Sequence, residues 1–153
     1  MSKLYNTEIA EIFNNLGWES LNCYEEKFGE NGTLGRETQM EVVLVRHLRE
    51  ALIKLNPTKP QVAIDKAIEE ITKNRSMLSM YAANQEIHKM LKDGVKVEYS
   101  DNDGIRKYET IRIIDWRNIQ NNDFFLAKQF WVTGKMYTRR ADLVGFINGI
   151  PLV

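Results

Sequence analysis

Residues 139–153 have the sequence RRADLVGFINGIPLV, in which Asn148-Gly149 separates two apolar runs. An Asn-Gly pair between apolar runs is the strongest short-range signal for a β-hairpin with a two-residue type I′ turn. Such a turn pairs Ile147 with Ile150, and the same count places Asp142 opposite position 155, two residues beyond this sequence. Because a carboxylate in an apolar strand is costly to bury unless it is paired or binds a cation, partners for Asp142 are expected in a continuation of the chain.

Two interpretations of Asp142 stay open on these residues alone. In the first, Asp142 lies near the end of a strand and is solvated or paired with Arg139 or Arg140. In the second, it is a metal ligand or a catalytic group, because unusual carboxylates of this kind are enriched at functional sites.

The rest of the second half predicts antiparallel strands. Val95, Val97 and Tyr99 alternate with polar residues, and DNDG at 101–104 supplies the turn before a return strand that reaches Ile114. Further strands are expected over residues 124–133 and 140–147, with a turn at Gly134 between them.

The first half predicts four helices. The first is capped by Asn6 or Thr7, and the second opens at the capping-box pattern Thr38-x-x-Glu41 and ends at Asn56-Pro57. The third starts near Pro60, and the fourth covers residues 76–92. The last two are expected to bury one apolar face each: Ile64, Ala67, Ile68 and Ile71 in the third, and Met77, Met80, Tyr81, Asn84, Ile87, His88 and Leu91 in the fourth.

Helices followed by hairpin strands indicate an α+β or mixed α/β fold, with the helices flanking a mostly antiparallel sheet that ends in a hairpin. The 153 residues are enough for a single domain, 1–153, and 43% hydrophobic with 27% charged residues indicates a globular chain. The formal net charge is zero, which excludes binding to nucleic acid by bulk charge alone. Cys23 is the one cysteine, so no internal disulfide is expected and a role as a nucleophile is disfavoured.

The sequence contains no signal peptide and no apolar run of the length that a membrane helix needs, which predicts a cytoplasmic protein without a membrane partner. It stops inside the apolar run IPLV at 150–153, where a strand would need neighbours, which suggests a fragment of a longer protein. Phosphate-loop, dinucleotide-binding and zinc-binding motifs are missing from the sequence.

Residues 140–153 resemble the R-P-D-hydrophobic-hydrophobic-x-F-hydrophobic-N-G-hydrophobic-P-L-V segment in the N-terminal nuclease domain of type I restriction endonuclease R subunits. Other stretches resemble the same family in the same order. These are Arg36-Glu37, Glu41-Val42-Val43-Leu44, Leu48-Arg49-Glu50-Ala51-Leu52, Leu55-Asn56-Pro57, Asn84-x-x-x-His88-x-x-Leu91-x-x-Gly94-Val95, Ile113-Ile114-Asp115-Trp116, Asn122-Asp123-Phe124 and Gln129-Phe130-x-Val132-x-Gly134.

The resemblance implies a restriction-endonuclease-like fold and a PD-(D/E)xK nuclease centre that cleaves DNA with Mg²⁺. Asp142 would be the catalytic aspartate and a metal ligand, and a Glu-x-Lys a few residues after Pro-Leu-Val would complete the site. In such enzymes ATP drives separate motor domains of the R subunit. The implied partners are double-stranded DNA and the methyltransferase and specificity subunits.

Two departures from the family pattern matter. Ala141 replaces the family's proline, which loosens the turn into the strand without removing a ligand. The family pattern places its Glu-x-Lys beyond residue 153, so the nuclease core is expected to be truncated and these 153 residues alone are expected not to cleave DNA.

Weaker candidates lie elsewhere in the chain. Glu8 is a candidate metal ligand, or simply a favourable charge near a helix N-terminus. Lys135, Arg139 and Arg140, with Lys128 nearby, are candidate DNA-binding residues or ordinary solvated charges.

Two other functions remain possible on the sequence. The chain could be a non-catalytic docking domain of a restriction or DNA-processing assembly, which the departure at Ala141 keeps open. It could also be an unrelated α+β domain. A Glu-x-Lys in the residues that follow would favour the nuclease over the docking domain. A structure with helices flanking a central sheet and Asp142 at an open strand position would argue against the unrelated domain.

Overall fold

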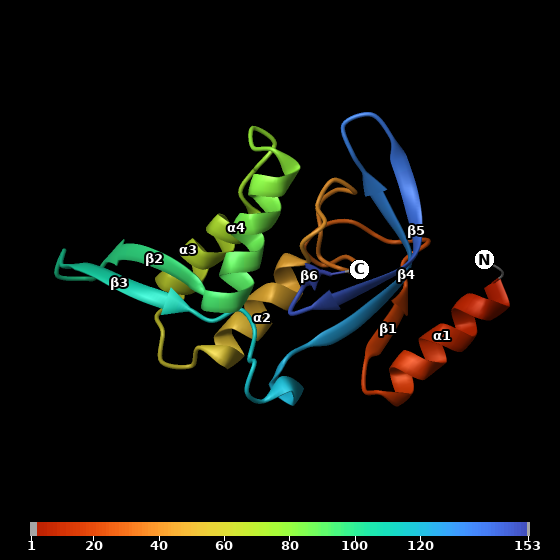
Figure 1. The fold of residues 1–153 in the computed structure, drawn as a ribbon, viewed down its shortest axis with the longest axis horizontal. Helices are drawn as coiled ribbons and strands as arrows, with labels where there is room; N and C mark the ends of the chain where they lie inside the picture. The colour runs from red at the N-terminus through yellow and green to blue at the C-terminus, as the bar shows by residue number, and fades with distance from the viewer. Residues whose placement is uncertain (1–2, 153) are drawn as a thin grey trace. The chain divides into compact units, whose positions relative to one another are not determined.

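The computed structural model describes the backbone of residues 3–152 and the side chains of residues 7–152 (Figure 1). Its helices are α1 (Lys3–Asn15), α2 (Val45–Leu55), α3 (Gln61–Thr72) and α4 (Met80–Asp93), with a 3₁₀ turn η1 at Ile119–Asn121. Its strands are β1 (Glu19–Asn22), β2 (Val95–Ser100), β3 (Arg106–Ile111), β4 (Phe124–Thr133), β5 (Thr138–Ile147) and β6 (Ile150–Pro151). The fold is α+β, which confirms the predicted class.

The chain forms two compact units. One contains the residues up to Leu48 together with those from Asp123 onward, and the other contains Arg49–Asn122. The first boundary therefore falls inside α2, between Leu48 and Arg49.

The first unit contains a four-stranded sheet in the order β1-β4-β5-β6. β4 and β5 are antiparallel, as are β5 and β6, whereas β1 runs parallel to β4. The predicted hairpin is confirmed: Ile147 pairs with Ile150, and Asn148 and Gly149 have φ of 51° and 79°, the positive values that a type I′ turn requires.

This turn is held tightly in the first unit. The backbone N–H of Asn148 donates to the carbonyl of Asp123 at 2.9 Å, and the N–H of Leu44 donates to the carbonyl of Gly149 at 2.8 Å. A side chain at Gly149 would place its Cβ 2.4 Å from the Leu44 carbonyl oxygen and 2.7 Å from the Leu48 nitrogen. Position 149 therefore requires glycine, both because its φ is positive and because the backbone of Leu44 and Leu48 leaves no space for a side chain.

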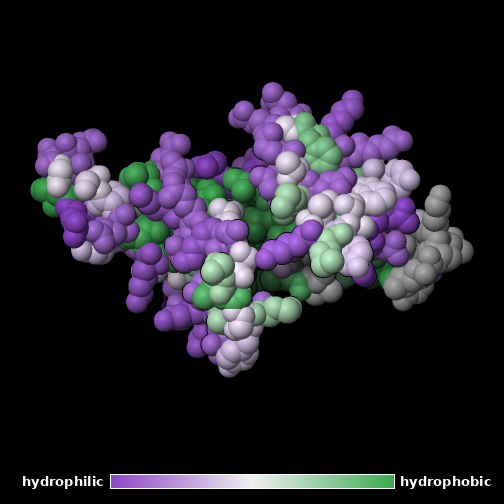
Figure 2. Space-filling model, turned by 90° about the horizontal axis from the view of Figure 1, so that it is seen from above, coloured by the Kyte–Doolittle hydropathy of each residue, from purple (hydrophilic) through white to green (hydrophobic). Residues whose placement is uncertain are grey.

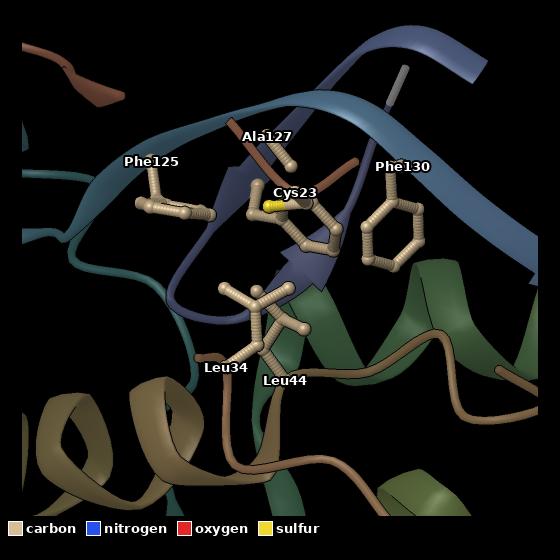
Figure 3. Close-up of a cluster of buried hydrophobic side chains, with 7 residues drawn as sticks. Cys23, Leu34, Leu44, Phe125, Ala127 and Phe130 are labelled. Atoms are coloured by element: carbon tan, nitrogen blue, oxygen red, sulfur yellow. The ribbon is translucent and has the colours of Figure 1, made fainter. Parts of the chain in front are cut away.

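The loop that follows β1 covers one face of this sheet. The buried cluster contains Cys23, Leu34 and Leu44 from the loop, with Phe125, Ala127, Phe130 and Phe146 from the strands (Figure 3). On the opposite face, Trp18 stacks on Phe124 at 5.2 Å between ring centroids and contacts Phe13 of α1 at 5.1 Å. Both faces are thus covered by segments that lie before β4 in the sequence.

Two details of this unit differ from the sequence predictions. α1 begins at Lys3, so neither Thr7 nor Asn6, whose side chain is not described, caps it. The Thr38–Glu41 pattern does not open a helix, because its groups close a local turn: the Thr38 hydroxyl accepts from the Met40 N–H and the Glu41 carboxylate accepts from the Glu37 N–H. α2 begins at Val45 instead.

The second unit contains α3, α4 and the β2–β3 hairpin. α3 buries Ala63, Ile64, Ala67, Ile68 and Ile71, which confirms its predicted stripe. The β2–β3 register pairs Val95 with Ile111 and Ser100 with Arg106, which confirms the predicted hairpin, but the return strand ends at Ile111 and not at Ile114.

The predicted inward face of α4 is wrong except at Ile87 and Leu91, which are half-buried. The helix is capped by Ser79, and Met80 and Tyr81 are 82% and 72% exposed. Asn84 and His88 are also exposed, so they form no buried pair. The half-buried positions are Ala82, Ala83, Ile87, Met90 and Leu91, which shows that the helix is rotated away from the expected stripe.

No helix in the described range combines the length and the apolar character that crossing a bilayer requires. The face seen in Figure 2 carries mostly hydrophilic residues with smaller hydrophobic areas among them.

Candidate functional site

Asp142 lies in the middle of β5 and is half-buried. Among the described residues its carboxylate has no hydrogen bond and no ion pair, so the predicted alternative of a pair with Arg139 or Arg140 is not observed. An unpaired carboxylate on a strand is available to bind a cation or water.

The backbone is distorted opposite Asp142. The β4–β5 register pairs Lys128 with Leu143 and Phe130 with Ala141, which places Gln129 across from Asp142, but this one position forms no regular bridge. Gln129 has φ of 56°, a left-handed conformation that costs a non-glycine residue about 1–2 kcal/mol.

The distortion changes which side chains face the core. Residues two apart in a strand share a face, yet Phe125, Ala127 and Phe130 all point into the same cluster (Figure 3). The alternation therefore shifts by one residue at Gln129, and we call this position the β4 kink. Asp142 lies directly across from it. Strained backbone of this kind is typical of functional sites.

Asp142 alone does not make a metal site. Its carboxylate is the hard oxygen donor that Mg²⁺ prefers, but the described residues include no group of three acidic, histidine or cysteine side chains that could hold a metal. Glu8 is exposed on α1, and no contact links it to Asp142. The metal role of both residues stays a prediction.

The four candidate DNA-binding residues lie on both sides of the β4 kink. Lys128 is half-buried on β4, one position before the kink, and Lys135, Arg139 and Arg140 are exposed on the hairpin beyond it. None of the four forms an ion pair within residues 7–152. The structure thus brings the candidate basic residues and Asp142 onto one hairpin, with Lys135 in its turn.

Sequence reasoning missed the aromatic surroundings of Arg140. The Arg140 guanidinium lies over the rings of Tyr24 and Trp131, with its carbon 5.4 and 5.6 Å from their centroids. Tyr24 belongs to a loop more than 100 residues earlier, so no local pattern could have revealed this grouping.

It also missed a pair between His47 and Asp123. His47 Nδ1 lies 3.0 Å from an Asp123 carboxylate oxygen, and the imidazole stacks on Phe125 at 4.7 Å. The backbone N–H of Asp123 donates to the Asn148 side chain, so the pair helps to hold the start of β4 at the hairpin turn.

Cys23 is fully buried, which disfavours a role as a nucleophile, as the sequence predicted. Burial raises the pKa of its thiol to about 12, and the nearby Glu26 carboxylate contributes to this increase. The thiolate that would react is therefore absent at neutral pH.

The comparisons with known proteins agree with one another. The family described as type I restriction enzyme R protein N terminus matches residues 2–153. The type I restriction enzyme HindI endonuclease subunit of Haemophilus influenzae is 38% identical over 144 residues, which are 90% of this chain and 13% of that protein. A Methanocaldococcus jannaschii protein, provisionally named the type I restriction enzyme MjaIXP endonuclease subunit, is 33% identical over 122 residues, or 76% of this chain and 11% of that protein.

Proposed function

The chain belongs to the type I restriction enzyme R protein N terminus family, and from this premise we propose that it forms the N-terminal endonuclease domain of a longer restriction subunit. It spans little more than a tenth of the length of the curated relatives that it matches. The activity of the whole protein is therefore part of the proposal. We propose a type I site-specific deoxyribonuclease that hydrolyses phosphodiester bonds in double-stranded DNA.

The position of Asp142 carries this proposal. The carboxylate is unpaired, half-buried and opposite the β4 kink, on the strand that the confirmed Asn148-Gly149 turn joins to β6. Continued outward, the β5–β6 register sets Asp142 opposite position 155. We therefore place the other ligands, a Glu-x-Lys, in the part of the longer protein that follows residue 153.

Within this site each group has a distinct task. Asp142 would supply one oxygen ligand to Mg²⁺, and a bound Mg²⁺ polarises a phosphate and lowers the pKa of a coordinated water. Lys128, Lys135, Arg139 and Arg140 would hold DNA phosphates on either side of Asp142. Glu8 is a weaker candidate for a further metal ligand.

The proposed setting is a multi-subunit restriction complex. Methyltransferase and specificity subunits would be the protein partners, with recognition of the DNA sequence assigned to the latter. ATP would bind to motor domains elsewhere in the longer protein. We place the complex in the cytoplasm, because its substrate is intracellular DNA.

The test uses the full-length protein in its complete complex. With ATP and Mg²⁺, Asp142→Asn should reduce cleavage of plasmid DNA at least about a hundredfold, because the cleavage step needs this carboxylate as a metal ligand. The hydrolysis of ATP does not need it. ATP hydrolysis should continue. Asp103→Asn, on the exposed β2–β3 turn, is the matched control and should cleave normally. Unchanged cleavage by Asp142→Asn would favour the non-catalytic docking domain instead.

A further inference from the structure

The end of the β4–β5 hairpin carries uncompensated positive charge. We define the ribbon arm as residues 130–141, FWVTGKMYTRRA, which contain three cations, Lys135, Arg139 and Arg140, and no acidic residue. The arm extends past the neighbouring strands, since β1 pairs only with residues 125–128 of β4, and β6 only with residues 146 and 147 of β5 (Figure 1). Although the net charge of the chain is zero, three unpaired cations without an acidic neighbour in the arm make this part locally positive and favour an anionic partner.

The Arg140 side chain is held in a defined position at the base of the arm. Its guanidinium lies over two rings, Tyr24 and Trp131, whose centroids are 5.9 Å apart. Cation–π contacts use the flat faces of the guanidinium, so its N–H groups remain available as donors at the edge. No described residue accepts a hydrogen bond from them.

The two segments that carry the rings are tied to each other and to a buried ion pair. Trp131 Nε1 donates to the Tyr24 carbonyl at 3.3 Å, and Arg36 Nη2 donates to the Trp131 carbonyl at 2.6 Å. Arg36 is paired with Glu26, and both side chains are only 1% exposed. A cation held on a rigid support loses less conformational entropy on binding than a free surface arginine.

The position of Arg140 indicates which kind of anionic partner the arm binds. It lies two residues before Asp142 on β5, about 7 Å along the strand, so a phosphate at Arg140 would be close to one at Asp142. Both rings already contact the guanidinium, which leaves them poorly placed to stack on unpaired bases. A two-stranded β-ribbon also fits the major groove of B-form DNA.

We propose that the ribbon arm binds the sugar–phosphate backbone of duplex DNA without sequence preference, with Arg140 as its main phosphate contact and Tyr24 and Trp131 as positioning residues. Arg139, over the Tyr137 ring at 5.7 Å, and Lys135 extend the contact toward the tip. This inference rests on the proposed function, to which it adds Arg140 as the main phosphate contact and Tyr24 and Trp131 as the residues that position it.

The test measures binding without cleavage. The 153-residue chain is titrated into a fluorescent duplex of about 30 base pairs with EDTA present, from about 50 to about 200 mM salt, and binding is followed by anisotropy. Arg140→Gln removes the charge, and Arg140→Lys keeps it while replacing the planar group. Tyr24→Leu removes one ring. The matched controls are Arg106→Gln, whose exposed side chain is paired with Glu98, and Tyr108→Leu, both on β3.

The expected results separate charge from positioning. Arg140→Gln should bind about tenfold more weakly at the lowest salt and should reduce the slope of log K against log salt by about 1. Arg140→Lys and Tyr24→Leu should keep the slope and bind about two- to fivefold more weakly. Both controls should stay within about twofold of the unmodified chain, and circular dichroism should show that every variant is folded.

Three outcomes would overturn the inference: no salt-dependent binding by the unmodified chain at the lowest salt, equal losses in Arg106→Gln and Arg140→Gln, or tighter binding to a single strand of the same length. The proposed function fails separately. If Asp142→Asn abolishes cleavage in the complex while the Arg140 and Tyr24 variants bind normally, the nuclease stands and the arm does not. Normal cleavage by Asp142→Asn, combined with weakened binding by the arm variants, would support the DNA-binding arm and contradict the nuclease.

Discussion

Gly149 is the residue at which the β5–β6 turn leaves no room for a side chain. Gly149→Ala combines an unfavourable positive φ with a clash against the backbone of Leu44 and Leu48, which cannot move aside as a flexible side chain could. We expect it to lower the free energy of unfolding by about 3 kcal/mol or more, measured by urea denaturation.

Gly104 provides the matched control for this prediction. Its φ is 78°, against 79° at Gly149, but a Cβ at Gly104 would meet nothing within 4 Å. Gly104→Ala should therefore lose only the conformational part, about 1 kcal/mol. Equal losses in the two variants would show that conformation alone, without close approach to Leu44, explains the glycine.

Asp115 gives a prediction about pH. Its carboxylate accepts hydrogen bonds from the Asn118 N–H, the Asn121 side chain and the Arg117 N–H, and these bonds lower its pKa. Because the folded pKa is below the unfolded value of about 4, the stabilisation is present above pH 4 and is lost as the pH falls through the folded pKa.

The measurement compares Asp115→Asn with the unmodified chain by urea denaturation at pH 7 and at about pH 2. The variant should be less stable at pH 7, and the difference should shrink at the acidic pH, where the aspartate is protonated as well. A difference that is the same at both pH values would contradict the assigned cause.

At the scale of single residues, the sequence predicts the role of a residue when that role depends on its neighbours in the chain. Asn148-Gly149 could be assigned because a two-residue turn depends on its own φ values, and Asp142 because a carboxylate stands out in an apolar strand. Arg36 could not be assigned, because its burial depends on Glu26 and on the Trp131 carbonyl, 95 residues away. No pattern near Arg36 records that distant acceptor.

At the scale of elements, substitutions at the β4 kink are expected to change the stability of the protein differently from substitutions at an ordinary strand position. Gln129→Gly should leave stability unchanged or raise it by up to about 1 kcal/mol, because glycine adopts a positive φ without strain. Gln129→Val should lower it by at least about 1 kcal/mol, since β-branched residues disfavour this conformation. Both are measured by urea denaturation.

Lys128 is the neighbouring control on the same strand. It pairs regularly with Leu143 and has no positive φ, so Lys128→Gly should destabilise the protein by about 0.5–1 kcal/mol. If Gln129→Gly is as destabilising as Lys128→Gly, the kink is not a strained position.

Elements that depend on local signals were predicted well, and those that depend on distant partners were not. The bounds of β4 follow from the polar segment before it and from Gly134 after it, and the β2–β3 hairpin follows from the alternation of β2 and the turn residues at 101–104. β1 has four residues and exists through parallel pairing with β4, so nothing in residues 19–22 identifies it. α2 starts late because the Leu44 N–H bonds to the Gly149 carbonyl, outside any local capping pattern.

At the scale of the whole chain, the incomplete ligand set predicts inactivity. The described residues contain no group of three metal ligands, so these 153 residues should not nick supercoiled plasmid DNA with Mg²⁺, as judged by agarose gel electrophoresis. The full-length protein in its complex is the positive control.

Efficient nicking by the 153-residue chain that disappears in Asp142→Ala would contradict this prediction. It would mean that Asp142 assembles a working site from ligands within the chain itself. Nicking that persists in Asp142→Ala would instead indicate a contaminating nuclease.

The fold class and the family could both be predicted from the sequence, because ordered similarity and a helix-then-strand pattern extend over most of the chain. The division into two compact units could not. A linker rich in glycine or proline would have indicated it, but one boundary lies within the continuous helix α2.

The Asn148-Gly149 turn also bears on how the protein ages. Asn-Gly is the dipeptide in which the following backbone nitrogen most readily attacks the side-chain carbonyl carbon of asparagine, which releases ammonia and forms a cyclic succinimide. Water then opens the succinimide, mainly to isoaspartate, whose extra backbone atom does not fit a type I′ turn. In the folded state Asn148 is fully buried and bonded to Asp123, which withholds the flexibility that this cyclisation needs. Each unfolding event removes that protection, so chemical damage at one position gradually makes unfolding irreversible.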